Sequence, residues 1–460
     1  MSIRLSIVAV LTAGFTAGSA PVISHHGVPV PVGADTLKAV PMPSKSDRER
    51  VEWLERSLAH DSMEGRALAS PGEHRAARFL ASEMKRIGLK PGGDDKYLQR
   101  VPLAMMIPPP RPPAGGMTVT FDRSGGGRGA AGVTPPECLA KAPERPPVAP
   151  ADSVTRARVT SNAPGAAGTV RGAPVQANAA AGAGGRSGRG GVGFAPSAVA
   201  QAPRPRMVTL PSMKDWDTVA KAQQRTAANV IGILPGRDPV LKHEIVVVLS
   251  HYDHLSIRTP AIPGADSIFN GADDDAAGTV AVLEIARLLR KAGKPKRTIV
   301  FANMTGEESG MVGTSFWIAH PTFPLTQIVA ALEIEMIGRP DSLAGGPGKA
   351  WLTGYERSTM GDMLKQYGIA IMPDRRPEQS FFSRSDNIAL ARRGIVAHTL
   401  STFNLHTDYH RVTDDVDKVD FDHMTAVIHA AAEAVRHLAD GPKPAWHPGC
   451  DPSQPPPARP

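Results

Sequence analysis

From Asn229 onwards the chain alternates short, β-rich apolar runs with helical patterns, and this alternation is the feature that most constrains its fold. The runs are VIGILPG, EIVVVLS, TIVFANM, IVAALEIE and GIVAHTLS. Runs rich in Val and Ile that are separated by amphipathic helices predict strands joined by crossovers, with helices on both faces of the sheet. We therefore expect an α/β three-layer sandwich with a mixed, mostly parallel central sheet.

Helix signals are clear at three places. Ser70 and Glu73 form a capping box with Pro71 at the first helical position, and Gly88 ends the apolar periodicity. This predicts a helix in the N-terminal segment, which therefore belongs to the fold. Two further helices are predicted, one over about Ala276–Ala292 and one over FDHMTAVIHAAAEAVRHL near the C-terminus.

Composition divides the rest of the chain. Residues 1–20 carry a basic residue, an apolar run and then small residues, which is typical of a signal peptide and implies an exported protein, periplasmic or extracellular. Residues 107–210 are of low complexity and have too little apolar surface to offset the entropy of ordering, so we expect most of them to be disordered. Two folded parts, 45–106 and 211–440, flank this insert, and 441–460 form a Pro-rich tail that we expect to be loose.

The charge of the chain excludes some classes of partner. The net charge is +8, and the stretch from Arg111 to Arg206 accounts for all of it, so the folded parts are neutral. A nucleic-acid or anionic-membrane surface therefore has no support there. No apolar run of membrane-spanning length follows the signal peptide, so stable membrane insertion is not expected after cleavage. Cys138 and Cys450 could pair, but both lie in Pro-rich stretches, and the chain does not look built on disulfides.

Acidic residues and histidines follow the predicted strands directly. His251 and Asp253 come after EIVVVLS, Glu307 and Glu308 come after TIVFANM, and Glu335 ends IVAALEIE. In open α/β sheets, ligands bind outside the carboxyl ends of the strands. Two loops supply further candidates, which are Asp273, Asp274 and Asp275 in NGADDDAAG, and His406 and His410 in LHTDYHRVTDD.

Each of these groups has a structural explanation when it is taken alone. A histidine at a strand end is usually just hydrogen-bonded, and an acidic triplet can cap a helix. Together at one sheet edge, however, the carboxylates repel unless a cation neutralises them, and imidazole among them indicates zinc or a similar ion. Asp253 is spaced to hold the imidazole of His251. Adjacent Glu307 and Glu308 cannot point the same way, so one can bind metal while the other addresses a water, which is a hydrolase arrangement.

The motifs HYDHL, DSIFNGADDDAAG, TGEESGMVG, EIEMIG and DYHRVTDDVDKVD, in this order, resemble metallopeptidase family twenty-eight. These are co-catalytic zinc exopeptidases that include leucyl aminopeptidases and glutamate carboxypeptidase. The resemblance covers roughly Arg48–Leu103 and Asn229 to about Leu438. It implies the zinc-exopeptidase (phosphorylase/hydrolase-like) fold, with 45–106 as the N-terminal part and 211–440 as the main part of a catalytic domain.

The family pattern also implies roles for single residues. Glu307 would be the general base, and Asp253 would support the catalytic site. Two Zn²⁺ ions would be bound, with Asp274 bridging them. The implied metal ligands are His251, Asp274, Glu308, Glu335 and His410.

Three departures from the family pattern stand out. Many relatives have Asp where this chain has Glu335, which is one methylene longer and still an oxygen ligand. The family often has Ser-Asp-His where this chain has Ser385, Asp386 and Asn387. Many secreted relatives also carry a folded protease-associated domain where this chain has the insert 107–210.

The resemblance implies an exported dinuclear zinc exopeptidase that hydrolyses a terminal peptide bond of a peptide substrate. An aminopeptidase is the first expectation, because that activity is the commonest among the relatives, and a carboxypeptidase is the second. The alternatives are a mononuclear glutaminyl cyclase and a non-catalytic binding domain. Retention of all five ligands argues against both.

Overall fold

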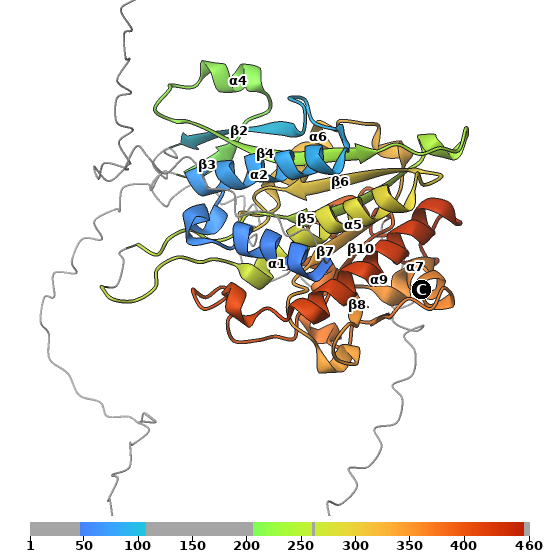
Figure 1. Ribbon diagram of the computed structural model, residues 1–460. Coiled ribbons are helices and arrows are strands. Elements are labelled where there is room, and N and C mark those ends of the chain that lie inside the picture. Colours follow the sequence, from blue (N-terminus) through green and yellow to red (C-terminus); the bar gives the residue numbers. More distant parts are fainter. Residues whose placement is uncertain (1–46, 107–205, 260–262, 455–460) are drawn as a thin grey trace, which may run out of the picture.

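The computed structural model describes residues 47–106, 206–259 and 263–454 (Figure 1). Within them a ten-stranded sheet runs in the order β3-β2-β4-β6-β5-β7-β10-β8-β9, and β1 pairs with β4. The strands are β1 (Lys90–Pro91), β2 (Leu98–Met106), β3 (Arg206–Thr209), β4 (Gln224–Leu234), β5 (Ile245–His251), β6 (Thr298–Met304), β7 (Ile328–Glu335), β8 (Ala350–Leu352), β9 (Ile371–Pro373) and β10 (Ala397–Ser401).

The sheet is mixed, as expected. Strands β6, β5, β7 and β10 pair in parallel at its centre. The strands on the β4 side pair antiparallel, and so do β10 and β8. Parallel pairing is therefore concentrated in the middle of the sheet, where the buried Val- and Ile-rich runs lie.

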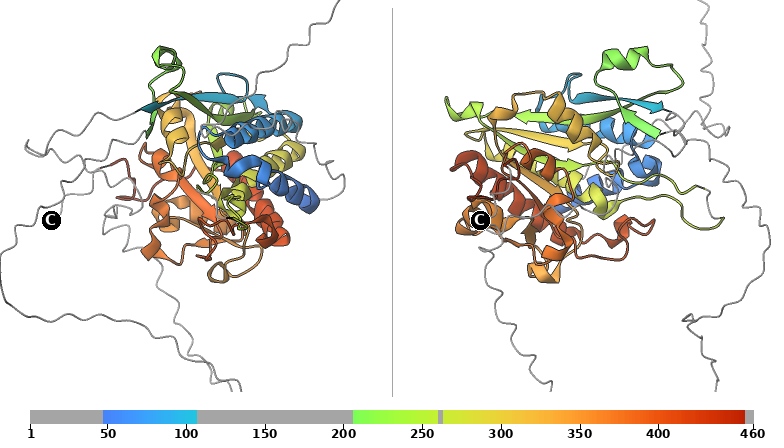
Figure 2. Two further views of the ribbon diagram at one scale, coloured as in Figure 1. Left: turned by 90° about the vertical axis from the view of Figure 1, so that its left-hand side faces the viewer. Right: turned by 180° about the vertical axis from the view of Figure 1, so that it is seen from behind.

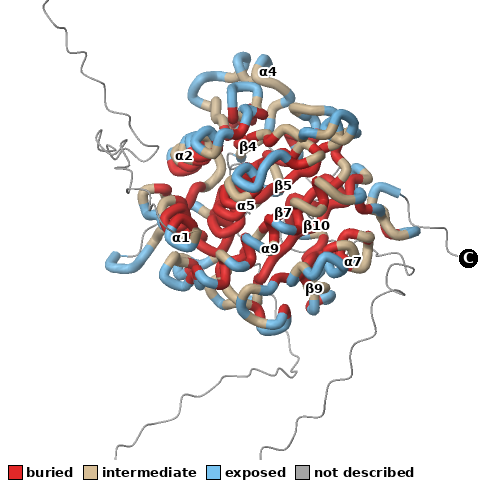
Figure 3. Tube along the Cα trace, turned by 45° about the vertical axis from the view of Figure 1, so that its right-hand side comes forward, coloured by how far each residue is buried: buried red, intermediate tan, exposed pale blue. Residues whose placement is uncertain are grey.

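Helices cover both faces of the sheet. They are α1 (Asp47–Leu58), α2 (Pro71–Ile87), α4 (Met213–Thr218), α5 (Gly278–Ala292), α6 (Val312–Ala319), α7 (Thr359–Gln366), α8 (Asn387–Ala391) and α9 (Phe421–Asp440). One large core cluster joins α1, α2, α5 and α9 to one face, and a second joins α6 and α8 to the other. Figure 2 shows the blue and red helices of the first group together on one side of the sheet, and in Figure 3 the central strands are the most continuously buried part. The three-layer α/β sandwich is confirmed.

The predicted helix boundaries agree closely with the structure. Ser70 Oγ accepts the backbone N–H of Glu73 at 3.1 Å, and Gly88 ends α2 with φ of 84°, a left-handed conformation that suits glycine. The helix expected from about Ala276 begins as α5 at Gly278, after an irregular helical segment over Ala272–Ala277. The final helix is α9.

The structure also bears on the segments outside this core. The predicted signal peptide over 1–20 and most of the insert 107–210 lie outside the described residues. Arg206–Thr209, at the end of the insert, form β3, which pairs with β2. The expectation of a loose tail is wrong for residues 441–454. There, Trp446 Nε1 donates to the carbonyl of Gly394 at 3.1 Å, and Cys450 is buried. None of the helices in the described ranges is long and apolar enough to cross a membrane.

Candidate metal centre

Parallel strands bring the predicted site residues to one edge of the sheet. His251 is the last residue of β5 and Glu335 the last of β7, while Glu307 and Glu308 follow β6 closely. Because these three strands run in parallel, their carboxyl ends lie together. Asp274 enters from the segment before α5, and its backbone N–H donates to Asp414 at 3.0 Å.

Asp274 lies between two histidines. Its Oδ1 is 3.3 Å from His251 Nε2, and its Oδ2 is 3.1 Å from His410 Nε2. His410 Nε2 is also 3.0 Å from Glu308 Oε1. The two oxygens of one buried carboxylate thus face different imidazoles, which is the placement that a ligand shared by two ions requires.

Several atoms at this centre are out of contact with solvent and lack partners. Within the described ranges, His251 Nε2, Glu308 Oε1 and His410 Nε2 make no hydrogen bond, although each lies near atoms of the other residues. Buried polar atoms without partners are costly, and cations bound at this centre would satisfy all three. Imidazole nitrogens and carboxylate oxygens are ligands that zinc takes. The residues present therefore fit a zinc site.

Glu333 and Glu335 in the EIE sequence differ sharply in surroundings. The carboxylate of Glu333 is fully buried and accepts hydrogen bonds from Ser385 Oγ at 2.8 Å, the backbone N–H of Asn387 at 2.8 Å and Thr399 Oγ1 at 2.9 Å. Glu335 instead lines a cavity with Asp274. Glu333 is therefore a structural carboxylate whose oxygens are hydrogen-bonded, and Glu335 is the one placed to bind a metal ion.

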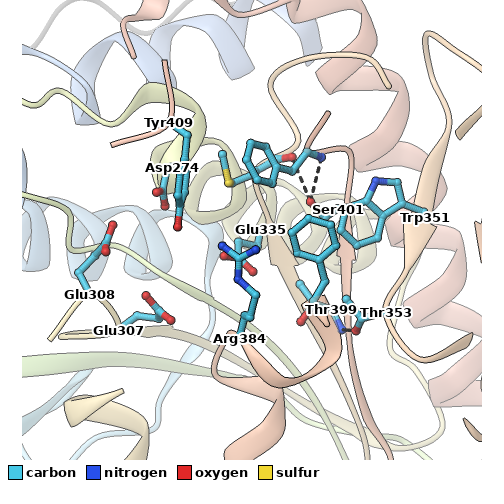
Figure 4. A pocket seen from close by; sticks show the side chains of 13 residues that line it. Asp274, Glu307, Glu308, Glu335, Trp351, Thr353, Arg384, Thr399, Ser401 and Tyr409 are labelled. Atoms are coloured by element: carbon cyan, nitrogen blue, oxygen red, sulfur yellow. Dashed lines mark hydrogen bonds between the residues drawn. The ribbon is translucent and has the colours of Figure 1, made fainter. Parts of the chain in front are cut away.

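A cavity lies beside the centre. In Figure 4, Asp274, Glu307 and Glu308 lie on one side of it and Trp351 on the other, with Arg384 between them. Aromatic side chains and three small polar ones form most of the remaining wall, alongside Met336. The lining residues are Asp274, Glu307, Glu308, Glu335, Met336, Trp351, Thr353, Phe381, Arg384, Thr399, Ser401, Phe403 and Tyr409.

Proton affinities at the centre reflect burial and crowding in the metal-free protein. Burial raises the pKa of Glu307 well above its ordinary value, and the charges of Glu335 and Asp386 act in the same direction. Burial opposes ionisation of Glu308 too, but the adjacent imidazoles of His254 and His410 outweigh it and lower its pKa. The pKa values of the two adjacent glutamates are therefore shifted in opposite directions. Glu307 is the better proton acceptor, and Glu308 is the more readily ionised carboxylate.

Asp253 contacts both the turn that follows β6 and the imidazole of His251. Its Oδ1 accepts the backbone N–H of Glu307 at 3.0 Å, and its Oδ2 accepts that of Glu308 at 3.3 Å. His251 Nδ1 lies 3.1 Å from the backbone carbonyl of Asp253 and 3.7 Å from its carboxylate. The carbonyl, rather than the carboxylate, is therefore the nearer partner of the imidazole.

The remaining members of the two candidate loops support the centre from outside. Asp273 Oδ1 accepts the backbone N–H of Gly338 at 2.6 Å, and its Oδ2 lies 2.9 Å from His406 Nε2. Asp275 Oδ1 accepts the backbone N–H of Gly278 at 2.9 Å and that of Met336 at 2.9 Å. Of the acidic triplet, only Asp274 faces the histidines of the centre.

Sequence reasoning missed His254 and Arg66. His254 Nδ1 lies 3.0 Å from Glu308 Oε1, and its position in HYDHL, next to the predicted residues, was the available signal. Arg66 donates to the backbone carbonyls of Leu58, Tyr252, Asn270 and Gly271 at 2.7–2.9 Å, and no short motif marks it.

The comparisons with known proteins point in one direction. The model of peptidase family M28 matches residues 229–435. Leucine aminopeptidase 1 of Sclerotinia sclerotiorum is 26% identical over 212 residues, which is 43% of this chain and 52% of that protein. A probable zinc metalloprotease of Pyrenophora teres f. teres is 32% identical over 114 residues, 25% of this chain and 22% of that protein. The chain thus spans about half the length of the first of these relatives, and less of the second.

Among solved structures, a leucine aminopeptidase precursor from Bacteroides thetaiotaomicron is similar, with 13% identity and a TM-score of 0.45, over 86% of this chain and 98% of that one. The family match covers every residue of the centre described above, from His251 to His410. The match to peptidase family M28 thus spans residues 229–435, the part of the chain that holds the whole candidate metal centre.

Proposed function

We propose that this protein is an exported zinc exopeptidase with two zinc ions, and that it acts as an aminopeptidase. The observation that carries the proposal is the convergence of His251, Asp274, Glu308 and His410 beside a cavity, with buried atoms that have no hydrogen-bond partner among the described residues. His251, Asp274 and Glu335 would hold one ion, and Asp274, Glu308 and His410 the other. Export rests on the sequence of residues 1–20.

The chain's own residues supply the proton transfer. When bound, zinc polarises the scissile carbonyl and lowers the pKa of the attacking water. Glu307 lies in the cavity wall beside Glu308, and its raised pKa suits a group that takes a proton and later gives it back. In this proposal Glu307 takes a proton from the water and passes it to the leaving amine.

The cavity wall supports an aminopeptidase with an apolar preference. Trp351, Phe381, Phe403 and Tyr409 offer aromatic surface to a substrate side chain. Relatives named leucine aminopeptidase agree with such a preference. One observation favours a carboxypeptidase as the second candidate, because Arg384 in the same wall could pair with a terminal carboxylate.

The experiment is a substrate panel assayed together with metal analysis. Amino-acid anilides, free dipeptides, N-blocked dipeptides and dipeptide amides should be tested with the zinc-loaded protein. An aminopeptidase cleaves anilides and dipeptide amides and requires the free amine, whereas a carboxypeptidase cleaves N-blocked dipeptides and requires the free carboxylate. About two zinc ions per chain are expected. One ion would favour the cyclase arrangement, and none would contradict the proposal.

A further inference from the structure

His254 is a buried imidazole that faces the candidate metal centre. Its side chain is inaccessible, and neither ring nitrogen makes a hydrogen bond to any residue in the described part of the chain. Nδ1 lies 3.0 Å from Glu308 Oε1 and 3.8 Å from Asp274 Oδ2. A buried imidazole normally satisfies at least one nitrogen, so its orientation toward two carboxylates calls for an explanation.

The separations around His254 match those in a zinc site. With tetrahedral zinc bonds of about 2.0–2.1 Å, neighbouring ligand atoms lie about 3.3 Å apart. The observed separations are 3.0 and 3.8 Å from His254 Nδ1 to Glu308 and Asp274, and 3.0 and 3.1 Å from His410 Nε2 to the same two carboxylates. Among the described residues, His254, Asp274 and Glu308 offer ligand atoms that lie within 4.8 Å of one another, close enough for one ion.

The two histidines approach this carboxylate pair from different directions. The rings of His254 and His410 are 5.7 Å apart at an angle of 69°, so they are not stacked and each can direct a nitrogen toward the pair. The 3.0 Å contact of His254 with Glu308 lacks the geometry of a hydrogen bond. An approach without a hydrogen bond is what two atoms show when both are aimed at a third position between them.

We propose that His254 is a fourth protein ligand of the second metal position, together with Asp274, Glu308 and His410. This rests on the proposed function, since it assumes that the centre binds zinc. The second position is then closed by four protein ligands, whereas the first, formed by His251, Asp274 and Glu335, keeps an open place. Closed zinc sites are structural, and open ones accept water or substrate. The two positions are therefore unequal, and the second ion is the one held more tightly.

Metal binding tests this assignment without relying on turnover. Metal-free full-length wild type and the His254→Ala variant are titrated with zinc, and ions per chain are counted after dialysis. Wild type is expected to retain about two ions, one more tightly than the other. His254→Ala should weaken the tighter step by at least roughly 10 to 100-fold, the loss that removal of even an outer partner causes. His410→Ala should affect the same step.

Two further variants separate a ligand from a packing or positioning residue. His254→Gln keeps bulk and can hydrogen-bond to Glu308, so it restores zinc affinity if His254 only positions that carboxylate and does not if His254 binds the ion. His423→Ala removes an equally buried imidazole that is engaged by the backbone N–H of Gly348 at 2.8 Å, and it should leave both zinc steps unchanged.

The Co²⁺-substituted proteins provide a spectroscopic readout. The visible absorption of the tightly bound Co²⁺ should change in His254→Gln, because an imidazole has been lost from the ion. Wild-type zinc affinity and an unchanged Co²⁺ spectrum in His254→Gln would overturn the assignment while leaving the proposed function intact. A wild-type protein that binds no zinc would overturn the proposed function itself.

Discussion

The carboxylate of Asp253 accepts the backbone N–H of Glu307 at 3.0 Å, across 54 positions of sequence. The same carboxylate accepts the N–H of Glu308, so it fixes the turn from which both glutamates project. The proposed base and the proposed metal ligand are therefore oriented by the residue that also presents its carbonyl to His251. One residue, Asp253, thus contacts the ends of both β5 and β6, through its carbonyl and its carboxylate respectively.

The two glutamates should respond differently to loss of charge. Glu307→Gln keeps the size of the side chain but cannot accept a proton, so zinc content should stay at the wild-type level while turnover falls by roughly 10² to 10⁴. Glu308→Gln should lower zinc affinity, because a neutral amide is a poor ligand. Zinc per chain after dialysis and the rate at saturating zinc measure both effects. Loss of metal from Glu307→Gln with retention in Glu308→Gln would mean that the roles are exchanged.

Glu335 and Glu333 offer a matched pair two positions apart on one strand. Glu335→Ala should reduce occupancy of one zinc position by roughly 10 to 100-fold or more, with the fold retained. Glu333→Ala should instead lower the free energy of unfolding, because the buried donors of Ser385, Asn387 and Thr399 lose their acceptor. Metal analysis and urea unfolding of both variants check this. Two tightly held ions in Glu335→Ala would rule out its role as a ligand.

The insert should be dispensable for folding. Met106 and Arg206 are antiparallel partners on β2 and β3, although residues 107–205 lie between them. Partners in an antiparallel pair have Cα atoms about 4.5–5.5 Å apart, so a short Gly-Ser turn can join them. The shortened protein should keep its zinc content and its turnover of small substrates. An insoluble product, with the wild type soluble under the same conditions, would show that the insert contributes to the fold.

Acid should destabilise the protein through His398. This buried imidazole lies between Ser358 Oγ and the carbonyl of Thr353, each at 2.7 Å, and burial lowers its pKa to about 4. The unfolded chain takes up a proton near pH 6.5 while the folded one does not, so stability is lost as pH falls from about 6.5 towards 4. The loss is at most roughly 3 kcal/mol. Urea unfolding in EDTA at pH 7.5 and 4.5 should show a smaller difference for His398→Gln, and an equal difference would exclude His398 as the cause.

Arg66 should matter to both stability and metal binding. Its guanidinium is buried and donates to four backbone carbonyls, two of which, those of Asn270 and Gly271, lie just before the Asp273–Asp275 triplet. Arg66→Met should cost at least about 3 kcal/mol of unfolding free energy, because several buried acceptors lose a charged donor. Zinc affinity should fall as well. Unfolding with and without zinc separates the two effects, and a variant with wild-type stability would contradict this role.

Much of the fold could be predicted from local patterns. The apolar runs from β4 to β10 and the capping box of α2 depend on neighbours in sequence, and the strand-end rule gathered His251, Glu307 and Glu335 without knowledge of their contacts. The pairing of β2 with β3 could not be predicted, because an insert of low complexity hides the fact that its two ends are partners. His254 was not predicted as a ligand, because His251 in the same HYDHL motif already was, and the direction of the His254 ring cannot be deduced from the sequence.

Arg66 also connects the N-terminal segment, which lies outside the family match, to the loop that carries the proposed ligand Asp274. Arg66 donates both to that loop and to the backbone carbonyl of Tyr252. Glu73 of α2 accepts further hydrogen bonds from Tyr252 and Thr305. If docking of this segment tightens zinc, thermodynamic reciprocity requires that zinc tighten docking by the same factor. Removal of zinc should therefore expose residues 47–87 to proteases and to amide exchange before the central strands open.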